Sequence, residues 1–227
     1  MRVLFVNSNR CRALVAAPPI GLAYVATAAA DAGHDVRFAD LLFSKDPEKD
    51  LGPVLQKFDP EVVGVSVRNI DNVIRQRIES YAGGVESIIR TIRAVSRAKI
   101  VIGGPAISIL GYRALDNFDA DFAALGEGET VMPALLEALS GGESCEGIDG
   151  LHCRQGSGKA STPASRLERF GGSGLERWID WRLYARSGVR VIGGREFLND
   201  KDAGRNASEP RCSLVNLMRL QIGRAHV

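Results

Sequence analysis

The sequence has 227 residues, of which 45% are hydrophobic and 25% charged, as is usual for a folded globular protein. The formal net charge is +2, but the residues before Glu143 carry 15 Lys and Arg against 17 Asp and Glu, which gives no general attraction for nucleic acid. No apolar run reaches the roughly 18 residues of a membrane span, and the N-terminus lacks the pattern of a signal peptide. We therefore expect a cytoplasmic protein without a nucleic-acid or membrane partner.

The predicted elements alternate between strands and helices. In chain order they are strand 2–6, helix 19–33, strand 35–39, a short helix or turn at 51–58, strand 61–67, helix 84–97, strands 99–104 and 121–125, and helix 130–141. The third helix places Val85, Ile88, Ile89, Ile92 and Val95 on one face. Nearly continuous apolar strands predict an α/β fold over residues 1–142, a doubly wound, mainly parallel five-stranded sheet covered by helices on both sides.

The character of the chain changes after Gly142. Residues 143–191 are predicted to form a hairpin around Gly156-Ser157-Gly158, then a linker that contains Trp178 and Trp181. Residues 192–227 are expected to be a non-native or disordered tail. Its last six residues, 222–227, can be encoded by the start of a common sequencing adapter, so we expect a reading frame that was cut short.

Four loops should meet where the parallel strands end. They contain Asn7, Ser8, Asn9 and Arg10; the segment from Ser66 to Asn72, with Val67, Arg68 and Asn69; Gly103, Gly104, Pro105 and Ala106; and Gly126, Glu127, Gly128 and Glu129. Open α/β sheets bind ligands at this edge. Each loop alone is better explained by solvated side chains and helix capping, and acidic residues are favoured at a helix start in any case. The four together favour a ligand site.

The sequence lacks the motifs of the common nucleotide, phosphoacceptor and metal sites. The first loop, NSNRCRAL, has no glycine, which excludes the G-x-G-x-x-G dinucleotide fingerprint and argues against a flavin mononucleotide loop. A P-loop is absent, and so are the aspartates of a phosphoacceptor domain. The four cysteines (Cys11, Cys145, Cys153 and Cys212) and three histidines do not have metal-site spacing, so we expect reduced thiols and no protein-ligated metal. Gly103 and Gly104 leave the backbone bare, which suits a wide planar ligand or one with a tail between strands.

Four segments carry a family likeness. PPIGLAYVATAAADAGHDV, VGVSVRNIDN, IVIGGPAIS and ALGEGE resemble, in this order and spacing, the N-terminal cobalamin-binding domain of cobalamin-dependent radical S-adenosylmethionine enzymes. The resemblance covers about residues 1–142 and extends loosely to 191. It implies a flavodoxin-like Rossmann sheet with cobalamin over the carboxyl edge and the nucleotide tail between the loops after the third and fourth strands.

The resemblance also implies roles for the loop residues. Ser66, Val67, Arg68 and Asn69 would contact the corrin or its tail, Gly103, Gly104, Pro105 and Ala106 would line the tail groove, and Gly126, Glu127 and Gly128 would lie at the nucleotide end. Arg68 and Arg10 are candidates for the corrin amides or for an interface with the radical domain, although a surface ion pair explains Arg10 equally well. None of these residues is expected to be catalytic.

Two departures from the family pattern shape the expectations. Residues 7–18 contain no histidine, so cobalamin should bind base-off without a histidine ligand, while His34 should be a solvated turn residue at the opposite edge. The C-x-x-x-C-x-x-C motif is missing, so the [4Fe–4S] cluster, S-adenosylmethionine and the radical domain that acts as partner belong to a missing part of the parent enzyme, for example a methyltransferase. Two alternatives stay open: a free-standing cobalamin carrier or sensor, and a doubly wound nucleotide- or flavin-binding enzyme.

Overall fold

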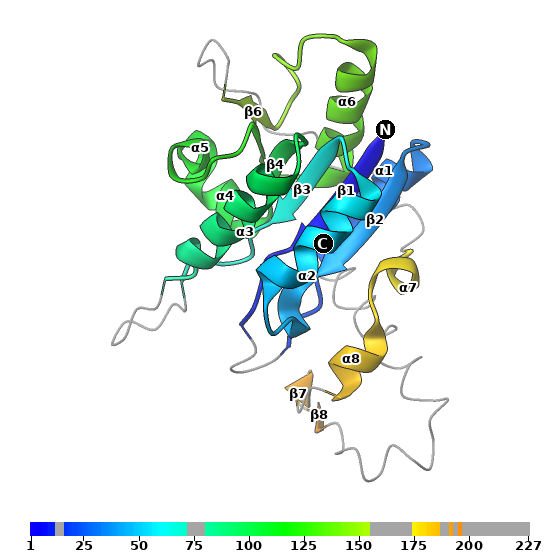
Figure 1. Ribbon diagram of the computed structural model, residues 1–227, viewed down its shortest axis with the longest axis vertical. Helices are drawn as coiled ribbons and strands as arrows, with labels where there is room; N and C mark the ends of the chain where they lie inside the picture. The colour runs from blue at the N-terminus through cyan, green and yellow to red at the C-terminus, as the bar shows by residue number, and fades with distance from the viewer. Residues whose placement is uncertain (12–15, 72–79, 155–173, 187–190, 193–194, 197–227) are drawn as a thin grey trace. The chain divides into compact units, whose positions relative to one another are not determined.

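The computed structural model describes residues 1–11, 16–71, 80–154, 174–186, 191–192 and 195–196 (Figure 1). The chain divides into two compact units. The first contains Met1–Arg10 and Pro19–Ile179, and the second contains Cys11–Pro18 and Asp180–Val227. The predicted hairpin turn at 156–158 and the predicted tail at 197–227 lie outside the described residues.

The first unit is built on a six-stranded sheet. Its strands are β1 (Arg2–Asn7), β2 (Asp35–Asp40), β3 (Val62–Ser66), β4 (Lys99–Gly103), β5 (Phe122–Ala124) and β6 (Leu151–Cys153), in the spatial order β2-β1-β3-β4-β5-β6. The first five are parallel, as the sequence predicts, and β6 pairs antiparallel with β5. The predicted fold class is confirmed, with one strand more than expected.

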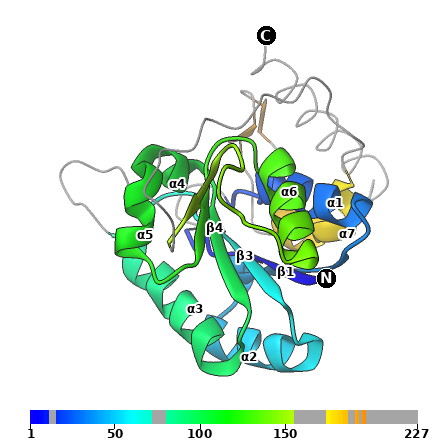
Figure 2. The ribbon, with the colours of Figure 1, turned by 90° about the horizontal axis from the view of Figure 1, so that it is seen from above.

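Helices cover both faces of this sheet (Figure 2). Helices α1 (Ile20–Asp31) and α6 (Gly128–Gly141) pack together on one face, and α2 (Pro47–Phe58) and α3 (Ala82–Val95) pack together on the other. Four short elements complete the layers: η1 (Leu41–Phe43), α4 (Pro105–Leu110), η2 (Gly111–Arg113) and α5 (Ala114–Asn117). Among the described residues, no helix is long and apolar enough to cross a bilayer.

Successive side chains along a strand pack alternately into two separate hydrophobic cores, one on each face of the sheet. In β1, Leu4 and Val6 pack in the cluster with α2 and α3, whereas Val3 and Phe5 pack in the cluster with α1 and α6. The Phe5 ring lies over Gly64 of β3, where an added Cβ would be 2.8 Å from the ring. The predicted face of α3 is buried except for Val95, which is 39% exposed because the helix ends there.

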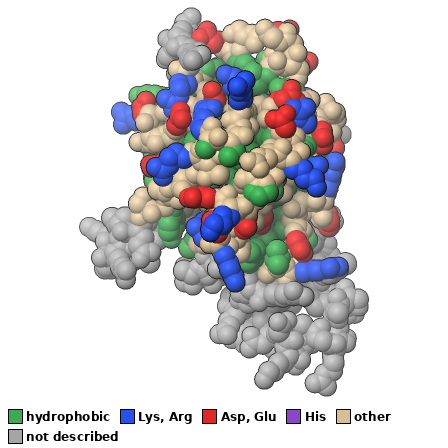
Figure 3. Space-filling model, viewed as in Figure 1, with side chains coloured by type: hydrophobic (Ala, Val, Ile, Leu, Met, Phe, Trp, Pro, Cys, Tyr) green, Lys and Arg blue, Asp and Glu red, His purple; other side chains and the backbone are tan. Residues whose placement is uncertain are grey.

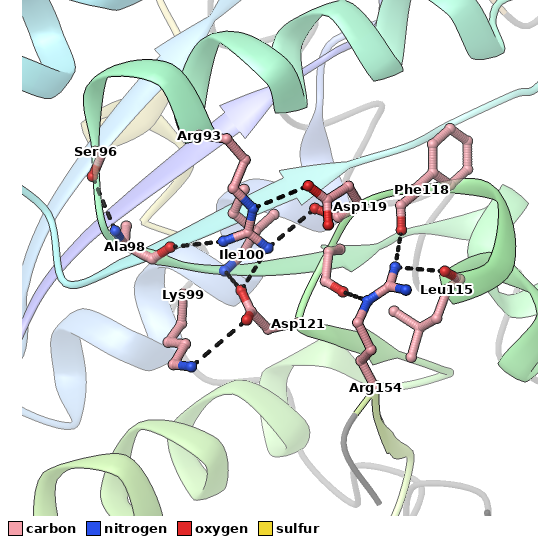
Figure 4. Close-up of polar contacts among 11 residues, drawn as sticks. Arg93, Ser96, Ala98, Lys99, Ile100, Leu115, Phe118, Asp119, Asp121 and Arg154 are labelled. Atoms are coloured by element: carbon pink, nitrogen blue, oxygen red, sulfur yellow. Dashed lines mark hydrogen bonds and ion pairs between the residues drawn. The ribbon is translucent and has the colours of Figure 1, made fainter.

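The amino edge of the sheet is fixed by a polar network (Figure 4). Arg93, near the end of α3, donates to Asp121 at 2.9 Å, and Asp121 also accepts from the backbone N–H of Ile100 at 2.7 Å. Arg154, just after β6, donates to the backbone carbonyls of Leu115, Phe118 and Ala120. These contacts join β4, β5 and β6 at the edge opposite the predicted ligand site.

Part of the predicted linker is anchored on the first unit. In α7 (Leu175–Trp178), the Trp178 Nε1–H donates to Thr27 Oγ1 at 2.9 Å, and its ring stacks on Phe38 with 6.2 Å between centroids. The preceding Gly174 has a φ of 46°, and an added Cβ would lie 2.6 Å from Thr27 Oγ1. Here a glycine permits close packing of α7 on α1.

The second unit contains α8 (Trp181–Arg186) and a two-stranded antiparallel ribbon of β7 (Val191–Ile192) and β8 (Arg195–Glu196). Within α8, the rings of Trp181 and Tyr184 tilt against each other at 6.3 Å.

Candidate functional site

The ends of four neighbouring strands form one row across the sheet. In the strand register, Asp40 of β2 lies beside Asn7 of β1, Asn7 beside Ser66 of β3, and Ser66 beside Gly103 of β4. Because these strands are parallel, the predicted loops leave from the same edge. The structure therefore brings the predicted site segments together, except for Asn72, which lies outside the described residues.

The loop after β1 is held by its own polar side chains. Asn7 is only 2% exposed; its Nδ2 donates to Asp40 Oδ1 at 2.7 Å, and its Oδ1 accepts from the backbone N–H of Asn9 at 3.2 Å. Asp40 Oδ1 also accepts from the N–H of Leu42 at 3.1 Å. Asn7 thus ties β1 to the end of β2. Asp40 was not among the predicted site residues. An aspartate at the end of the strand beside β1 could have indicated in the sequence a polar residue at this edge.

Ser8 joins this loop to β3. Its Oγ donates to the carbonyl oxygen of Ser66 at 2.7 Å, and its backbone N–H reaches the same oxygen at 3.3 Å. Ser8 is 8% exposed. Asn9 is half-buried and Arg10 is exposed. Of the four predicted residues in this loop, Asn7 and Ser8 shape the edge, and Arg10 presents its side chain to solvent.

The loop after β3 turns its side chains in two directions. Val67 is fully buried in the core beside α2 and α3, so it can offer a ligand only its backbone. Its N–H donates to the carbonyl oxygen of Gly103 at 2.7 Å. Arg68 and Asn69 are exposed. A cationic guanidinium and an amide therefore border the edge at this point.

The loop after β4 lies directly against the loop after β3. Gly104 has a φ of 102°, and a Cβ added there would lie 2.8 Å from the carbonyl oxygen of Val67 and 3.2 Å from Ser66 Oγ. The same carbonyl oxygen accepts from the N–H of Ala106 at 3.2 Å. Only glycine fits this crossing. Ala106 is buried in the core, whereas Pro105 is exposed.

Gly103 has a different environment from Gly104. A Cβ added at Gly103 would meet only Ala124, with 3.6 Å to its carbonyl oxygen and 3.7 Å to its Cβ, both ordinary contacts. The fold therefore has room for a side chain at Gly103. Gly103 is half-buried at the end of β4, between β3 and β5, and we call the bare backbone at this position the cradle.

The loop after β5 is held by a residue that the sequence motifs did not single out. Gly126 is exposed with a φ of 78°, and its N–H donates to Ser108 Oγ of α4 at 3.1 Å. The half-buried Glu127 accepts at its carbonyl oxygen from the hydroxyl of Thr130 at 2.8 Å. At Gly128 an added Cβ would lie 2.8 Å from Val25 Cγ2, so this glycine serves the packing of α6 on α1.

The described histidines lie outside these loops. His34 is at the amino edge, half-buried, with Nδ1 3.2 Å from the N-terminal nitrogen of Met1, so it is not the solvated turn residue that was predicted. Burial lowers its pKa, and the N-terminal ammonium lowers it further. His152 of β6 has a pKa lowered by burial. His34 is thus at the edge opposite the cradle, and His152 belongs to β6 and not to any of the four loops.

The described part of the chain contains no group of three or more His, Cys, Asp or Glu side chains that could hold a metal ion. Cys11, Cys145 and Cys153 are free thiols. Burial raises the pKa of Cys145 and of Cys153, so both favour the neutral thiol.

The carboxyl edge of the sheet can accept a ligand through backbone groups, small hydroxyls and the exposed Arg68. On the face drawn in Figure 3, basic and acidic side chains are interspersed.

Comparisons with known proteins point to one family. The family model of the B12 binding domain matches residues 12–136, more than half of the chain. Tryptophan 2-C-methyltransferase of Streptomyces laurentii is 28% identical over 165 residues, which are 71% of this chain and 27% of that protein. An uncharacterized methyltransferase of Pyrococcus horikoshii is 31% identical over 141 residues, 61% of this chain and 28% of that protein.

A solved structure is similar over most of the chain. It is the radical S-adenosylmethionine methyltransferase TsrM from Kitasatospora setae with cobalamin and a [4Fe–4S] cluster bound, with a TM-score of 0.69 and 28% identity. The match covers 82% of this chain and 38% of that one. The chain thus spans less than two fifths of the length of each of these relatives. These similarities confirm the resemblance of the four motifs and favour it over a nucleotide or flavin site.

Proposed function

Because the chain belongs to the B12 binding domain family, we propose that its carboxyl-edge loops hold cobalamin as the cofactor module of a cobalamin-dependent radical S-adenosylmethionine enzyme. The observation that carries the proposal is the cradle at Gly103, where the fold has room for a side chain but the chain has none. It lies in one strand row with Ser66 and Asn7, at the edge where doubly wound sheets bind their ligands.

The residues of this edge fit a large, flat cofactor with a tail. Gly103, Gly104 and Gly126 leave backbone without side chains at the ends of two strands, β4 and β5. We assign the nucleotide tail to the position beside Gly103, where an added Cβ would meet only Ala124. The exposed side chains of Arg68 and Asn69 can donate to the amide oxygens around the corrin rim. Gly126 and Glu127 would lie at the nucleotide end. Asn7 and Ser8 act indirectly, because they fix the loop after β1 through Asp40 and Ser66.

We propose that cobalamin binds base-off, without a protein ligand from below. The loop after β1 holds asparagines, a serine and an arginine, and residues 7–18 contain no histidine. His34 is at the opposite edge of the sheet. The neutral imidazole that coordinates cobalt in other B12 modules therefore has no counterpart in this loop.

When bound, the cofactor supplies a cobalt atom that can carry a transferable group, and this chain supplies orientation and shielding. The complete protein is proposed to include a radical domain with a [4Fe–4S] cluster and S-adenosylmethionine, and to act as a methyltransferase. The names of the relatives and their greater length support this. The 227 residues themselves contain no C-x-x-x-C-x-x-C motif.

Filling the cradle tests the proposal without disturbing the fold. The substitution Gly103→Ala adds a methyl group that meets only ordinary contacts, so the melting temperature should stay close to that of the unchanged chain. If cobalamin lies there, the methyl group overpacks the complex and weakens hydroxocobalamin binding by about tenfold, measured by fluorescence quenching.

The matched control is Gly52→Ala on α2, where nothing lies within 4 Å of the added Cβ. It should leave cobalamin binding unchanged. Equal binding by the Gly103→Ala variant would remove the cradle from the site, and binding of flavin mononucleotide in preference to cobalamin would overturn the proposed cofactor.

A further inference from the structure

Ser108 links the loop after β4 to the loop after β5 at the carboxyl edge. A contact between these two loops was not predicted from the sequence. It lies in the first turn of α4, where its N–H donates to the carbonyl oxygen of Gly104 at 3.0 Å. Its Oγ accepts from the N–H of Gly126 at 3.1 Å, across 18 positions of the chain. One side of this contact belongs to the loop after β4 and the other to the loop after β5.

The loop after β5 needs such a contact to keep its place. Gly126 is exposed and has a φ of 78°, so it has neither a side chain nor burial to fix it. On the β6 side, the neighbouring Leu125 N–H donates to the carbonyl oxygen of Gly150 at 2.7 Å. On the α4 side, the Ser108 hydroxyl holds the loop by accepting from the Gly126 N–H. The loop is thus held between β6 and α4.

We propose that Ser108 is a positioning residue of the cofactor site, an inference that rests on the proposed cobalamin function. By fixing Gly126, it sets the separation of the loops after β4 and β5, and so the width of the site at the end assigned to the nucleotide. Ser108 acts through the Gly126 backbone and need not touch the cofactor.

This role predicts a selective effect on one part of the ligand. Cobinamide has the corrin ring of cobalamin but lacks the nucleotide tail. Replacing Ser108 with alanine should weaken cobalamin binding by about tenfold, the effect of roughly one hydrogen bond, and leave cobinamide binding within about twofold. Ser108→Thr keeps the hydroxyl and should restore cobalamin binding.

The matched control removes another exposed helix serine. Ser140 Oγ of α6 donates to the carbonyl oxygen of Leu136 at 2.7 Å, near the end of α6 remote from the Gly126 loop. The Ser140→Ala variant should bind both corrins as the unchanged chain does.

The experiment titrates the 227-residue chain and the three variants with hydroxocobalamin and with cobinamide, and measures amide hydrogen exchange of Gly126 without ligand. We expect the selective loss in Ser108→Ala, its rescue in Ser108→Thr, and faster exchange of the Gly126 amide in Ser108→Ala alone. Unchanged cobalamin binding, or an equal loss of both corrins, would overturn the role of Ser108. If the chain without substitutions binds neither corrin, the proposed function is contradicted instead. In that case, equal exchange of the Gly126 amide in this chain and in Ser108→Ala would reject the positioning role of Ser108 independently.

Discussion

At the scale of single residues, the polar side chains of the carboxyl edge fall into two groups. Asn7, Ser8 and Ser108 bind other loops of the protein, whereas Arg68 and Asn69 are exposed. The first group gives the edge a fixed shape before any ligand arrives. The second is available to a ligand. Preorganisation of this kind lowers the entropy that binding must otherwise cost.

Gly104 carries the sharpest prediction at this scale. Its φ of 102° and the 2.8 Å approach of the Val67 carbonyl oxygen leave no room for a Cβ. Gly104→Ala should lower the free energy of unfolding by about 1–3 kcal/mol and widen the crossing of two site loops, so that cobalamin binding weakens as well. Urea unfolding measures the first effect. The same change at Gly52 of α2 should lower the free energy of unfolding by less, because no atom other than those of its chain neighbours and the adjoining backbone of α2 lies within 4 Å of the added Cβ.

The two described histidines predict how stability depends on pH. Burial, and for His34 also the N-terminal ammonium, lowers the folded-state pKa of each below its usual value of 6.5. The unfolded chain therefore binds more protons near this pH, and the free energy of unfolding should fall as the pH drops through 6.5. His34→Gln should flatten this dependence between about pH 5 and 7, as measured by urea unfolding. An unchanged slope would show that His34 contributes nothing to it.

Some residue roles could not be predicted from the sequence. The motif pattern placed Asn7, Ser8, Val67 and Ala106 beside a ligand, but it cannot show that Asn7 binds an aspartate 33 positions away. Nor does it show that the side chains of Val67 and Ala106 are buried in the core. These outcomes depend on which loops meet, and that is decided by the strand order.

At the scale of elements, the packing of α6 against α1 requires a residue without a Cβ at one position. Gly128 opens α6 and would place a Cβ 2.8 Å from Val25 Cγ2 of α1. Because valine is stiff at χ1, it cannot easily move aside. This explains why the GEGE motif needs its second glycine even if no ligand touches it.

A double-mutant cycle tests this packing. Gly128→Ala should destabilise the protein by about 1–3 kcal/mol through overpacking, and Val25→Ala should be destabilising through its lost methyl groups. Combined, the two substitutions should cost clearly less than their sum, because the smaller residue 25 makes room for the new methyl group. Thermal and urea unfolding of the four proteins supply the cycle, and strict additivity would contradict the contact.

The elements were predictable where the chain gave long, clear patterns. All five parallel strands and the helices α1, α3 and α6 appear close to their expected positions. Helix α2 begins four residues before the short helix or turn predicted at 51–58. The short elements could not be predicted in this way, because β6 has three residues and α4 has six, too few to reveal a periodic pattern of apolar residues. The chain turns into β6 through Gly147 and Gly150, both with positive φ. Glycines in a polar segment predict a turn, but not which sheet edge the next residues join.

At the scale of the whole molecule, the fold and the family agree. A doubly wound sheet places its ligand at the edge where the strand order reverses, here between β1 and β3. The edge that we propose as the cofactor site has Ser66 and Gly103 side by side in the strand register and Gly126 held by Ser108. The opposite edge, with Arg93, Asp121 and Arg154, holds the sheet together.

The visible spectrum of the chain after incubation with hydroxocobalamin and desalting tests the central claim most directly. We predict that corrin co-elutes with the protein in a stoichiometric amount and shows a base-off spectrum, because the loop after β1 has no histidine and the tail is proposed to bind beside Gly103. A base-on spectrum would contradict the assigned place of the tail. A folded protein that elutes without corrin would contradict the cobalamin function itself.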